Sequence, residues 1–115
     1  MDASIRTALE ADPIVDITTR GRKSGEPRRI EMPLRLREGR IFISGRPGKR
    51  SWYANILANP DVTIHVKRGA TVDIPTRGLA ITDPAAKRAA LALFTSTDAL
   101  DAWVAGAPLV ELIEV

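Results

Sequence analysis

Short segments in which apolar and charged side chains alternate, separated by glycine and proline turns, constrain the fold of this chain most. In residues 28–37 the apolar side chains from Ile30 to Leu36 occupy every second position, which predicts a strand with one face against a core. Pro33 interrupts that run and indicates an edge strand or a bulge. Residues 62–67 repeat the alternation, so the chain is predicted to be rich in β structure.

Six strands are predicted, with helices between and after them. Hairpin-like spacing favours antiparallel pairing, so we expect a mainly β or α+β fold, which includes small barrels. Ser51 is a candidate N-cap for a helix that ends at Asn59-Pro60, and Asp83 caps a second helix. The strands are predicted over residues 14–19, 28–37, 40–44, 62–67, 70–82 and 109–115, and the helices over residues 3–11, 51–58 and 84–94, with further helical turns in 98–105.

Length and composition bound the class of protein. A chain of 115 residues with 44% hydrophobic and 27% charged residues predicts a single domain over residues 1–115. It has no cysteine, no signal-peptide pattern and no run of about 18 apolar residues, so we expect a cytoplasmic protein without a membrane span. His65 is the only histidine, which excludes a multi-histidine metal site within one chain. We interpret it as a surface residue or a hydrogen-bonded one rather than as a catalyst.

Positive charge is concentrated between Arg20 and Arg50. Eleven of the 17 lysine and arginine residues lie there against three acids, whereas the rest of the chain is net negative. Several of these cations lie in turns that also present backbone N–H groups, an arrangement that holds phosphate or carboxylate groups. The sequence therefore predicts an anionic ligand.

The first candidate site is the segment over residues 18–28, which forms one hairpin turn. Its cations and its serine would grip a phosphate and carboxylates through charge-assisted hydrogen bonds. The alternative is a solvated turn whose charge only keeps the protein soluble. The predicted ligand-binding residues of this turn are Arg20, Arg22, Lys23, Ser24 and Arg28.

The second candidate site is the glycine-containing loop that leads into the helix at residue 51. The positive end of that helix adds to the charge of the loop, and the glycines allow a ligand to approach the backbone. An aromatic side chain at the helix start would line a flat ring system, although a core position is equally compatible. We expect the two basic loops to converge on one ligand. The predicted residues here are Ser44, Gly45, Arg46, Gly48, Lys49, Arg50, Trp52 and Asn55.

The sequence indicates no obvious general base, which suits a reaction in which a cofactor supplies the chemistry. The segments ITTRGRKSGEPR at residues 17–28 and WYANILANPDV at residues 52–62, with Pro33-Leu34 and Ile43-Ser44-Gly45 between them, resemble the deazaflavin-dependent nitroreductase family. These are coenzyme F420-dependent oxidoreductases of the flavin-binding split-barrel superfamily. The resemblance covers about residues 14–67 in ordered motifs.

The resemblance implies a split β-barrel, here of six antiparallel strands with flanking helices, that binds reduced coenzyme F420 in a groove. The phosphate and oligoglutamate tail of this deazaflavin would account for the excess of positive charge. In the family the basic turn grips the phosphate and tail, and hydride passes to a quinone, an enone or a nitroaromatic. Ser44, at a strand end near the ring, is the candidate catalytic residue. Split barrels commonly pair, which favours a homodimer.

Two departures from the family pattern leave alternatives open. The loop over residues 45–51 is shorter than usual, so flavin mononucleotide (FMN) is an alternative cofactor, in a reductase or in a binding protein without turnover. Tyr53 is the only tyrosine, so the tyrosines that close over substrate in some members are missing. A nucleic-acid-binding module is disfavoured, because the cations lie in tight glycine loops and aromatic residues for base stacking are scarce.

Overall fold

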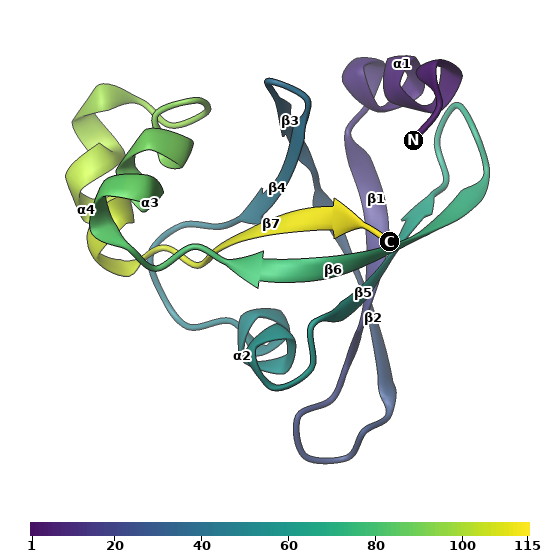
Figure 1. Ribbon diagram of the computed structural model, residues 1–115, viewed down its shortest axis with the longest axis horizontal. Coiled ribbons are helices and arrows are strands. Elements are labelled where there is room, and N and C mark those ends of the chain that lie inside the picture. The colour runs from purple at the N-terminus through teal and green to yellow at the C-terminus, as the bar shows by residue number, and fades with distance from the viewer.

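The computed structural model describes residues 1–115 as a curled antiparallel sheet with helices at its margins (Figure 1). The strands are β1 (Ile14–Arg20), β2 (Pro27–Pro33), β3 (Arg35–Arg37), β4 (Arg40–Ser44), β5 (Asp61–Val66), β6 (Val72–Ala80) and β7 (Leu109–Glu114). The helices are α1 (Ala3–Ala11), α2 (Ser51–Ala58), α3 (Pro84–Leu91), the 3₁₀ turn η1 (Thr97–Ala99) and α4 (Leu100–Gly106). Each predicted helix and strand is present, with ends that differ by a few residues.

The seven strands form one sheet in the order β2-β1-β5-β6-β7-β4-β3, and every neighbouring pair is antiparallel. The two edge strands, β2 and β3, are consecutive in the chain and are joined only through Leu34. The sheet therefore curls until its two edges meet at this residue. This arrangement confirms the predicted antiparallel split-barrel class.

The predicted strand over residues 28–37 is divided in the structure, which raises the strand count from six to seven. Its first part pairs with β1 and its last part pairs with β4, so the chain changes partner between Pro33 and Arg35. At the corner the Leu34 N–H donates to the Pro13 carbonyl at 2.9 Å, and the Leu34 side chain is 1% exposed. Pro33 has no backbone N–H to donate to a neighbouring strand, which is compatible with its place at this corner.

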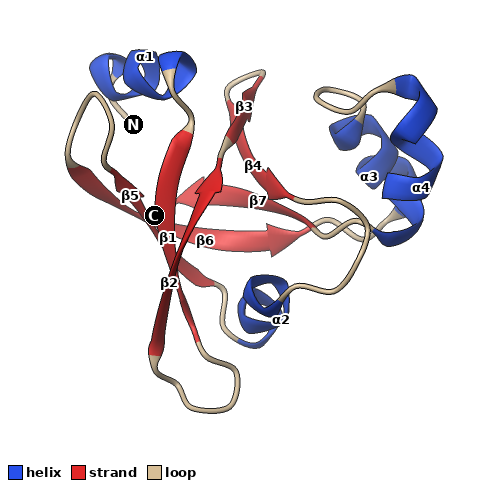
Figure 2. Ribbon diagram, turned by 180° about the vertical axis from the view of Figure 1, so that it is seen from behind, coloured by secondary structure: helices blue, strands red, loops and turns tan.

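Alternating side chains from the strands fill the inside of the barrel. The main core contains 15 buried residues, with Ile17, Ile43, Ile64 and Val110 among those that are completely buried. A second, smaller core lies where α3 and α4 pack on the outside of β4, around Phe42. Figure 2 shows these two helices beside β4, with α2 at the other end of the loop that follows the strand. The core thus fixes α2 and the β1–β2 hairpin relative to each other.

Two local details of the helices bear on the candidate site. Asp83 caps α3 as predicted, because its carboxylate accepts from the Ala86 N–H at 2.9 Å. The predicted N-cap of α2 was wrong: Arg50 occupies the cap position, no side chain caps the helix, and Ser51 is its first residue. None of the helices is long and apolar enough to cross a lipid bilayer.

Candidate functional site

The turn between β1 and β2 is closed by its own backbone. The Gly21 N–H donates to the Glu26 carbonyl, and the Gly25 N–H donates to the Gly21 carbonyl, both at 2.8 Å. Gly25 has φ +71°, a conformation that side chains disfavour, and a Cβ at Gly21 would lie 2.7 Å from the Ser24 hydroxyl. The glycines therefore allow a tight turn that brings the cations of residues 22–28 to one end of the hairpin.

Asn55 of α2 holds this turn against the barrel. Its Oδ1 accepts hydrogen bonds from the backbone N–H and from Nη1 of Arg22, each at 3.1 Å, and its Nδ2 donates to Thr19 Oγ1 at 3.2 Å. Asn55 is 4% exposed, and its bond to Thr19 is buried, whereas its two bonds to the exposed Arg22 are partly buried. Because both acceptor positions and one donor are occupied, Asn55 acts mainly by positioning Arg22.

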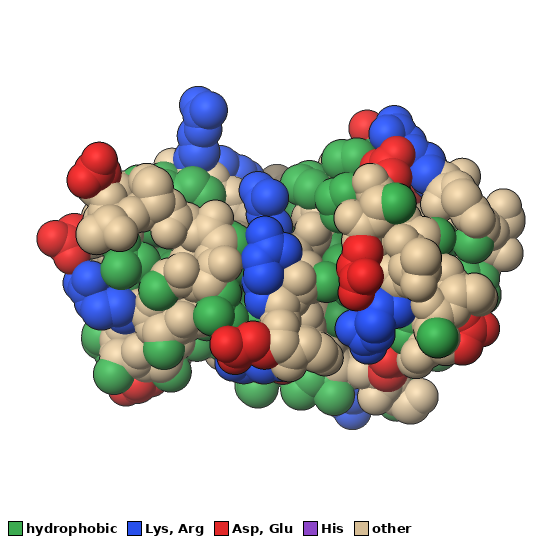
Figure 3. All heavy atoms as spheres, turned by 90° about the horizontal axis from the view of Figure 1, so that it is seen from above, with side chains coloured by type: hydrophobic (Ala, Val, Ile, Leu, Met, Phe, Trp, Pro, Cys, Tyr) green, Lys and Arg blue, Asp and Glu red, His purple; other side chains and the backbone are tan.

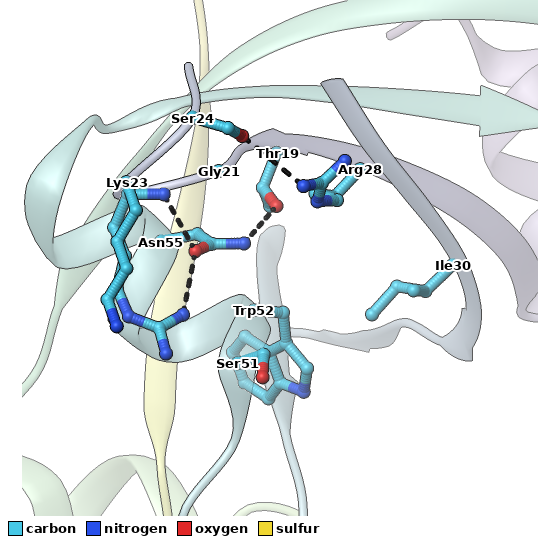
Figure 4. A pocket seen from close by; sticks show the side chains of 10 residues that line it. Thr19, Gly21, Lys23, Ser24, Arg28, Ile30, Ser51, Trp52 and Asn55 are labelled. Carbon is cyan, nitrogen blue, oxygen red and sulfur yellow. Dashed lines mark hydrogen bonds between the residues drawn. The ribbon is translucent and has the colours of Figure 1, made fainter. Parts of the chain in front are cut away.

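A cavity of about 540 Å³ opens between this turn, β2 and the start of α2, within the range that holds small molecules and cofactors. Figure 4 shows Lys23 and Ser24 at the left and top of the cavity, Arg28 and Ile30 at its right, and Trp52 below. No acidic side chain lines it. The lining residues are Thr19, Gly21, Arg22, Lys23, Ser24, Arg28, Ile30, Ser51, Trp52 and Asn55.

The cavity is lined by three cations and by two apolar side chains. Arg22, Lys23 and Arg28 form no ion pair within the chain, and Arg28 Nη2 donates to the Ser24 hydroxyl at 3.3 Å. Ile30 lies on the same face of β2 as the buried Met32. It remains 38% exposed because it lies beyond the packed core and lines the cavity. Trp52 is 8% exposed, so it serves both the core and the cavity wall.

The structure brings six of the thirteen predicted ligand-binding residues to this cavity, namely Arg22, Lys23, Ser24, Arg28, Trp52 and Asn55. The other seven, Arg20, Ser44, Gly45, Arg46, Gly48, Lys49 and Arg50, do not line it. The expected convergence of both basic loops is therefore not found, and only the helix start shares the cavity with the first turn.

The second loop is directed elsewhere by a contact with the end of α4 and by bonds within the loop. The Gly48 N–H donates to the Gly106 carbonyl at 3.1 Å, which holds the loop against the end of α4. The Arg50 guanidinium turns back and donates to the Arg46 and Lys49 carbonyls. The Ser44 hydroxyl donates to the Pro108 carbonyl at 2.5 Å, so this predicted catalytic residue connects β4 to the start of β7.

The excess of positive charge between residues 20 and 50 does not form one patch. Arg29 pairs with Asp16, and Arg40 pairs with Glu111 on the neighbouring strand. In Figure 3, lysine and arginine side chains also gather over the β3–β4 hairpin, between the lobe of α3 and α4 and the lobe of α1. There Arg37 Nε donates to the Leu93 carbonyl at 3.2 Å. Arg37 therefore connects β3 to the segment that follows α3.

His65 is hydrogen-bonded on both ring nitrogens, as the sequence predicted. Nε2 lies 2.6 Å from Thr18 Oγ1 and Nδ1 lies 2.8 Å from Asp73 Oδ1. Sequence reasoning missed four lining residues, Thr19, Gly21, Ile30 and Ser51. The alternation that placed Ile30 on the inner face was a usable signal, because it identified a side chain directed into the barrel end.

The family model for F420H(2)-dependent quinone reductase matches residues 1–97. The chain belongs to the F420H(2)-dependent quinone reductase family. It is accordingly an F420H2-dependent reductase, and its cofactor is coenzyme F420.

Solved structures show that this reductase shares its fold with several groups of proteins. A conserved hypothetical protein from Mycobacterium tuberculosis superposes with a TM-score of 0.75 at 15% identity, over 99% of the reductase and 80% of that chain. A putative 5-nitroimidazole antibiotic resistance protein from Bacteroides thetaiotaomicron gives 0.71 at 13% identity, over 96% and 77%. An F420-H2 dependent reductase gives 0.60 at 20% identity, over 88% and 94%. At these identities the likeness shows the fold.

Proposed function

We propose that the cavity between the β1–β2 turn and α2 holds coenzyme F420, and that the protein uses it to reduce a small electron-poor acceptor by hydride transfer. The observation that carries this proposal is that three cations, Arg22, Lys23 and Arg28, line the same cavity as Trp52 and Ile30. Family membership identifies the cofactor, and the lining of the cavity provides charged and apolar groups that suit the anionic tail and the ring of that cofactor.

The lining residues fit the two ends of the cofactor. Three cations without an acidic partner suit a phosphate and the first carboxylates of an oligoglutamate tail, since such bonds are strengthened by charge on both partners. The uncapped start of α2 adds its positive end next to Ser51. The indole of Trp52 and the side chain of Ile30 give an apolar wall for a planar ring.

In the proposed reaction the chain binds and orients. When bound, the cofactor supplies a hydride to the acceptor. The cations hold the anionic part, Asn55 fixes Arg22, and Trp52 and Ile30 exclude water from one face of the ring. The acceptor we propose is a quinone, an enone or a nitroaromatic, because each presents an electron-poor atom that accepts a hydride.

A parallel fluorescence titration of the purified protein with F420 and with FMN tests the cofactor assignment. We expect F420 to bind more tightly, because the cavity has three cations for a tail that FMN lacks. We also expect F420 binding to persist at moderate salt, whereas nucleic acid bound through its phosphates would be released steeply. Tighter binding of FMN than of F420 would contradict the proposal.

A turnover assay tests the reaction. Reduced F420 should be oxidised when protein and menadione are mixed without oxygen, and a nitroaromatic compound and a cyclic enone can then replace menadione. Deuterium placed at the hydride-donating carbon of the cofactor should slow single-turnover oxidation if hydride transfer limits the rate. If the protein binds F420 tightly but none of the three acceptors causes oxidation of reduced F420, the proposed acceptor classes are rejected.

A further inference from the structure

A second hollow lies on a different face of α2 and shares no lining residue with the cofactor cavity. Its volume is about 440 Å³. The loop before α2, the helix α3 and the end of α4 come together around it, and Figure 1 shows this loop passing the lower end of the α3–α4 pair. The lining residues are Gly48, Lys49, Tyr53, Lys87, Ala105, Gly106, Ala107 and Pro108.

The walls of this hollow are fixed by the fold. The hydrogen bond from the Gly48 N–H to the Gly106 carbonyl joins the loop to the end of α4. Arg50 Nη2 donates to the Arg46 carbonyl at 3.0 Å and closes the loop on itself. A Cβ at Gly106 would lie 3.3 Å from Pro47 Cβ, so the two segments are in close contact. A ligand would therefore meet a preformed surface, which lowers the entropic cost of binding.

The polar side chains of the hollow have no partners within the chain. Neither Lys49 nor Lys87 forms an ion pair or a side-chain hydrogen bond, and the Tyr53 hydroxyl forms no hydrogen bond. No acid lines the hollow, and the neighbouring Asp101 of α4 already binds Arg88 at 2.8 Å. Burial lowers the pKa of the half-buried Lys87, and no carboxylate opposes that shift.

We propose that this hollow binds a small aromatic carboxylate, with the carboxylate between Lys49 and Lys87 and the ring against Tyr53 and the aliphatic wall of Ala105, Ala107 and Pro108. Two lysines without a counter-charge supply charge-assisted donors for one carboxylate. The rest of the lining is aromatic or aliphatic, which suits a ring better than a polyanion. The site is separate from the cofactor cavity, and its occupant need not be a substrate of the reductase.

Amide NMR of the full chain tests the proposal, with 2-naphthoate as the probe and the neutral 2-naphthamide as its matched control. We expect 2-naphthoate to shift the amides of Gly48, Gly106 and Ala107 and to bind at least about tenfold more tightly than 2-naphthamide. The Lys49→Gln/Lys87→Gln variant should lose about tenfold in naphthoate affinity or more. Arg46→Gln removes a charge from the same loop outside the lining and should leave that affinity unchanged.

Three results would overturn the proposal. Equal binding of the acid and the amide would show that the lysines do not act on the ligand. Unchanged naphthoate affinity in a lysine double variant with a folded spectrum would remove both residues from the site. Displacement of naphthoate by saturating F420 would assign the hollow to the cofactor instead. The direct titrations with naphthoate and naphthamide contain no F420. Their outcome therefore does not depend on whether the cofactor proposal holds.

Discussion

The side-chain oxygen of Asn55 accepts two hydrogen bonds from Arg22, one from the backbone N–H and one from the guanidinium, each 3.1 Å long. These bonds span 33 positions of the sequence and connect α2 to the β1–β2 turn. The helix thereby sets both the position of the turn and the direction of one of its cations.

Asn55→Ala should destabilise the protein and weaken F420 binding together. The substitution leaves the buried Thr19 hydroxyl and the Arg22 N–H without their partner, a loss of about 1–3 kcal/mol in the free energy of unfolding. Urea denaturation and F420 titration measure the two effects. Asn59→Ala, which removes an exposed cap of the Asp61 N–H, is the matched control and should leave F420 affinity unchanged. Unaltered affinity in Asn55→Ala would show that the turn keeps its position without this residue.

Arg22→Ala/Lys23→Ala should weaken F420 binding at least about tenfold, since two charge-assisted contacts to the anionic part are lost. Fluorescence titration measures the affinity. Arg6→Ala/Arg77→Ala removes the same charge from positions outside the cavity, so it separates specific contacts from the general electrostatic field. If both double variants lose affinity equally, the turn does not contact the cofactor.

Ile30→Ala should reduce F420 affinity by about threefold to tenfold, because part of the apolar wall beside the ring is removed. Leu79→Ala is the matched control. Both are strand residues with substantial exposure, 38% for Ile30 and 54% for Leu79, but only Ile30 lines the cavity. A similar affinity for the two variants would place the ring away from β2.

Ser44→Ala should cost about 1 kcal/mol of stability and leave F420 affinity and turnover unchanged, because its hydroxyl donates to the Pro108 carbonyl and does not line the cavity. The sequence alone favoured a catalytic role for this residue. Thermal melts and a steady-state assay distinguish the two outcomes. A large fall in turnover with an unchanged melting temperature would restore Ser44 to the reaction.

Acid should destabilise the fold partly through Asp16. The hydrogen bond from Lys67 and then that from Arg29 lower the pKa of the Asp16 carboxyl below its ordinary value of 3.8. A carboxyl with a lowered folded-state pKa stabilises the fold above its unfolded-state pKa, and that stability is lost as the pH falls through the folded-state value. As the pH is lowered through the acid range, the melting temperature of the Asp16→Asn variant should therefore fall less steeply than that of the wild type. Asp61→Asn, which removes an acid without an ion pair, should keep the wild-type slope.

Local patterns predicted the elements of the fold well, because they depend on neighbouring residues. Alternation located the strands, and Asp83-Pro84 located the start of α3. Pro33 indicated an edge strand or bulge, and the chain does leave β2 there. The division of residues 28–37 between two sheet edges was not predictable, since it depends on β4, which pairs with β3, and on the Pro13 carbonyl, which binds Leu34.

The sequence could predict that the β1–β2 turn contributes to the candidate site, but it could not predict where the loop over residues 45–50 lies. The cations of residues 22–28 stay together because two glycines close the turn locally. The direction of the second loop depends on Gly106, which is far away in sequence. No local pattern could therefore show that Lys49 lines the same hollow as Lys87 and not the same cavity as Arg22. The sequence predicts Asn55 as a ligand contact, whereas its hydrogen bonds to Thr19 of β1 and to Arg22 of the turn give it a supporting role.

The single-residue corner at Leu34 restricts how the chain can change in length. A residue inserted or deleted there would turn β3 by one position, which moves Arg35 to the interior side and Leu36 to the solvent side. Exposed loop tips outside the proposed cofactor site tolerate extra residues better, because little of their backbone is buried. Length variation among relatives should therefore be found at those tips, while the number of residues between the end of β2 and the start of β3 stays constant.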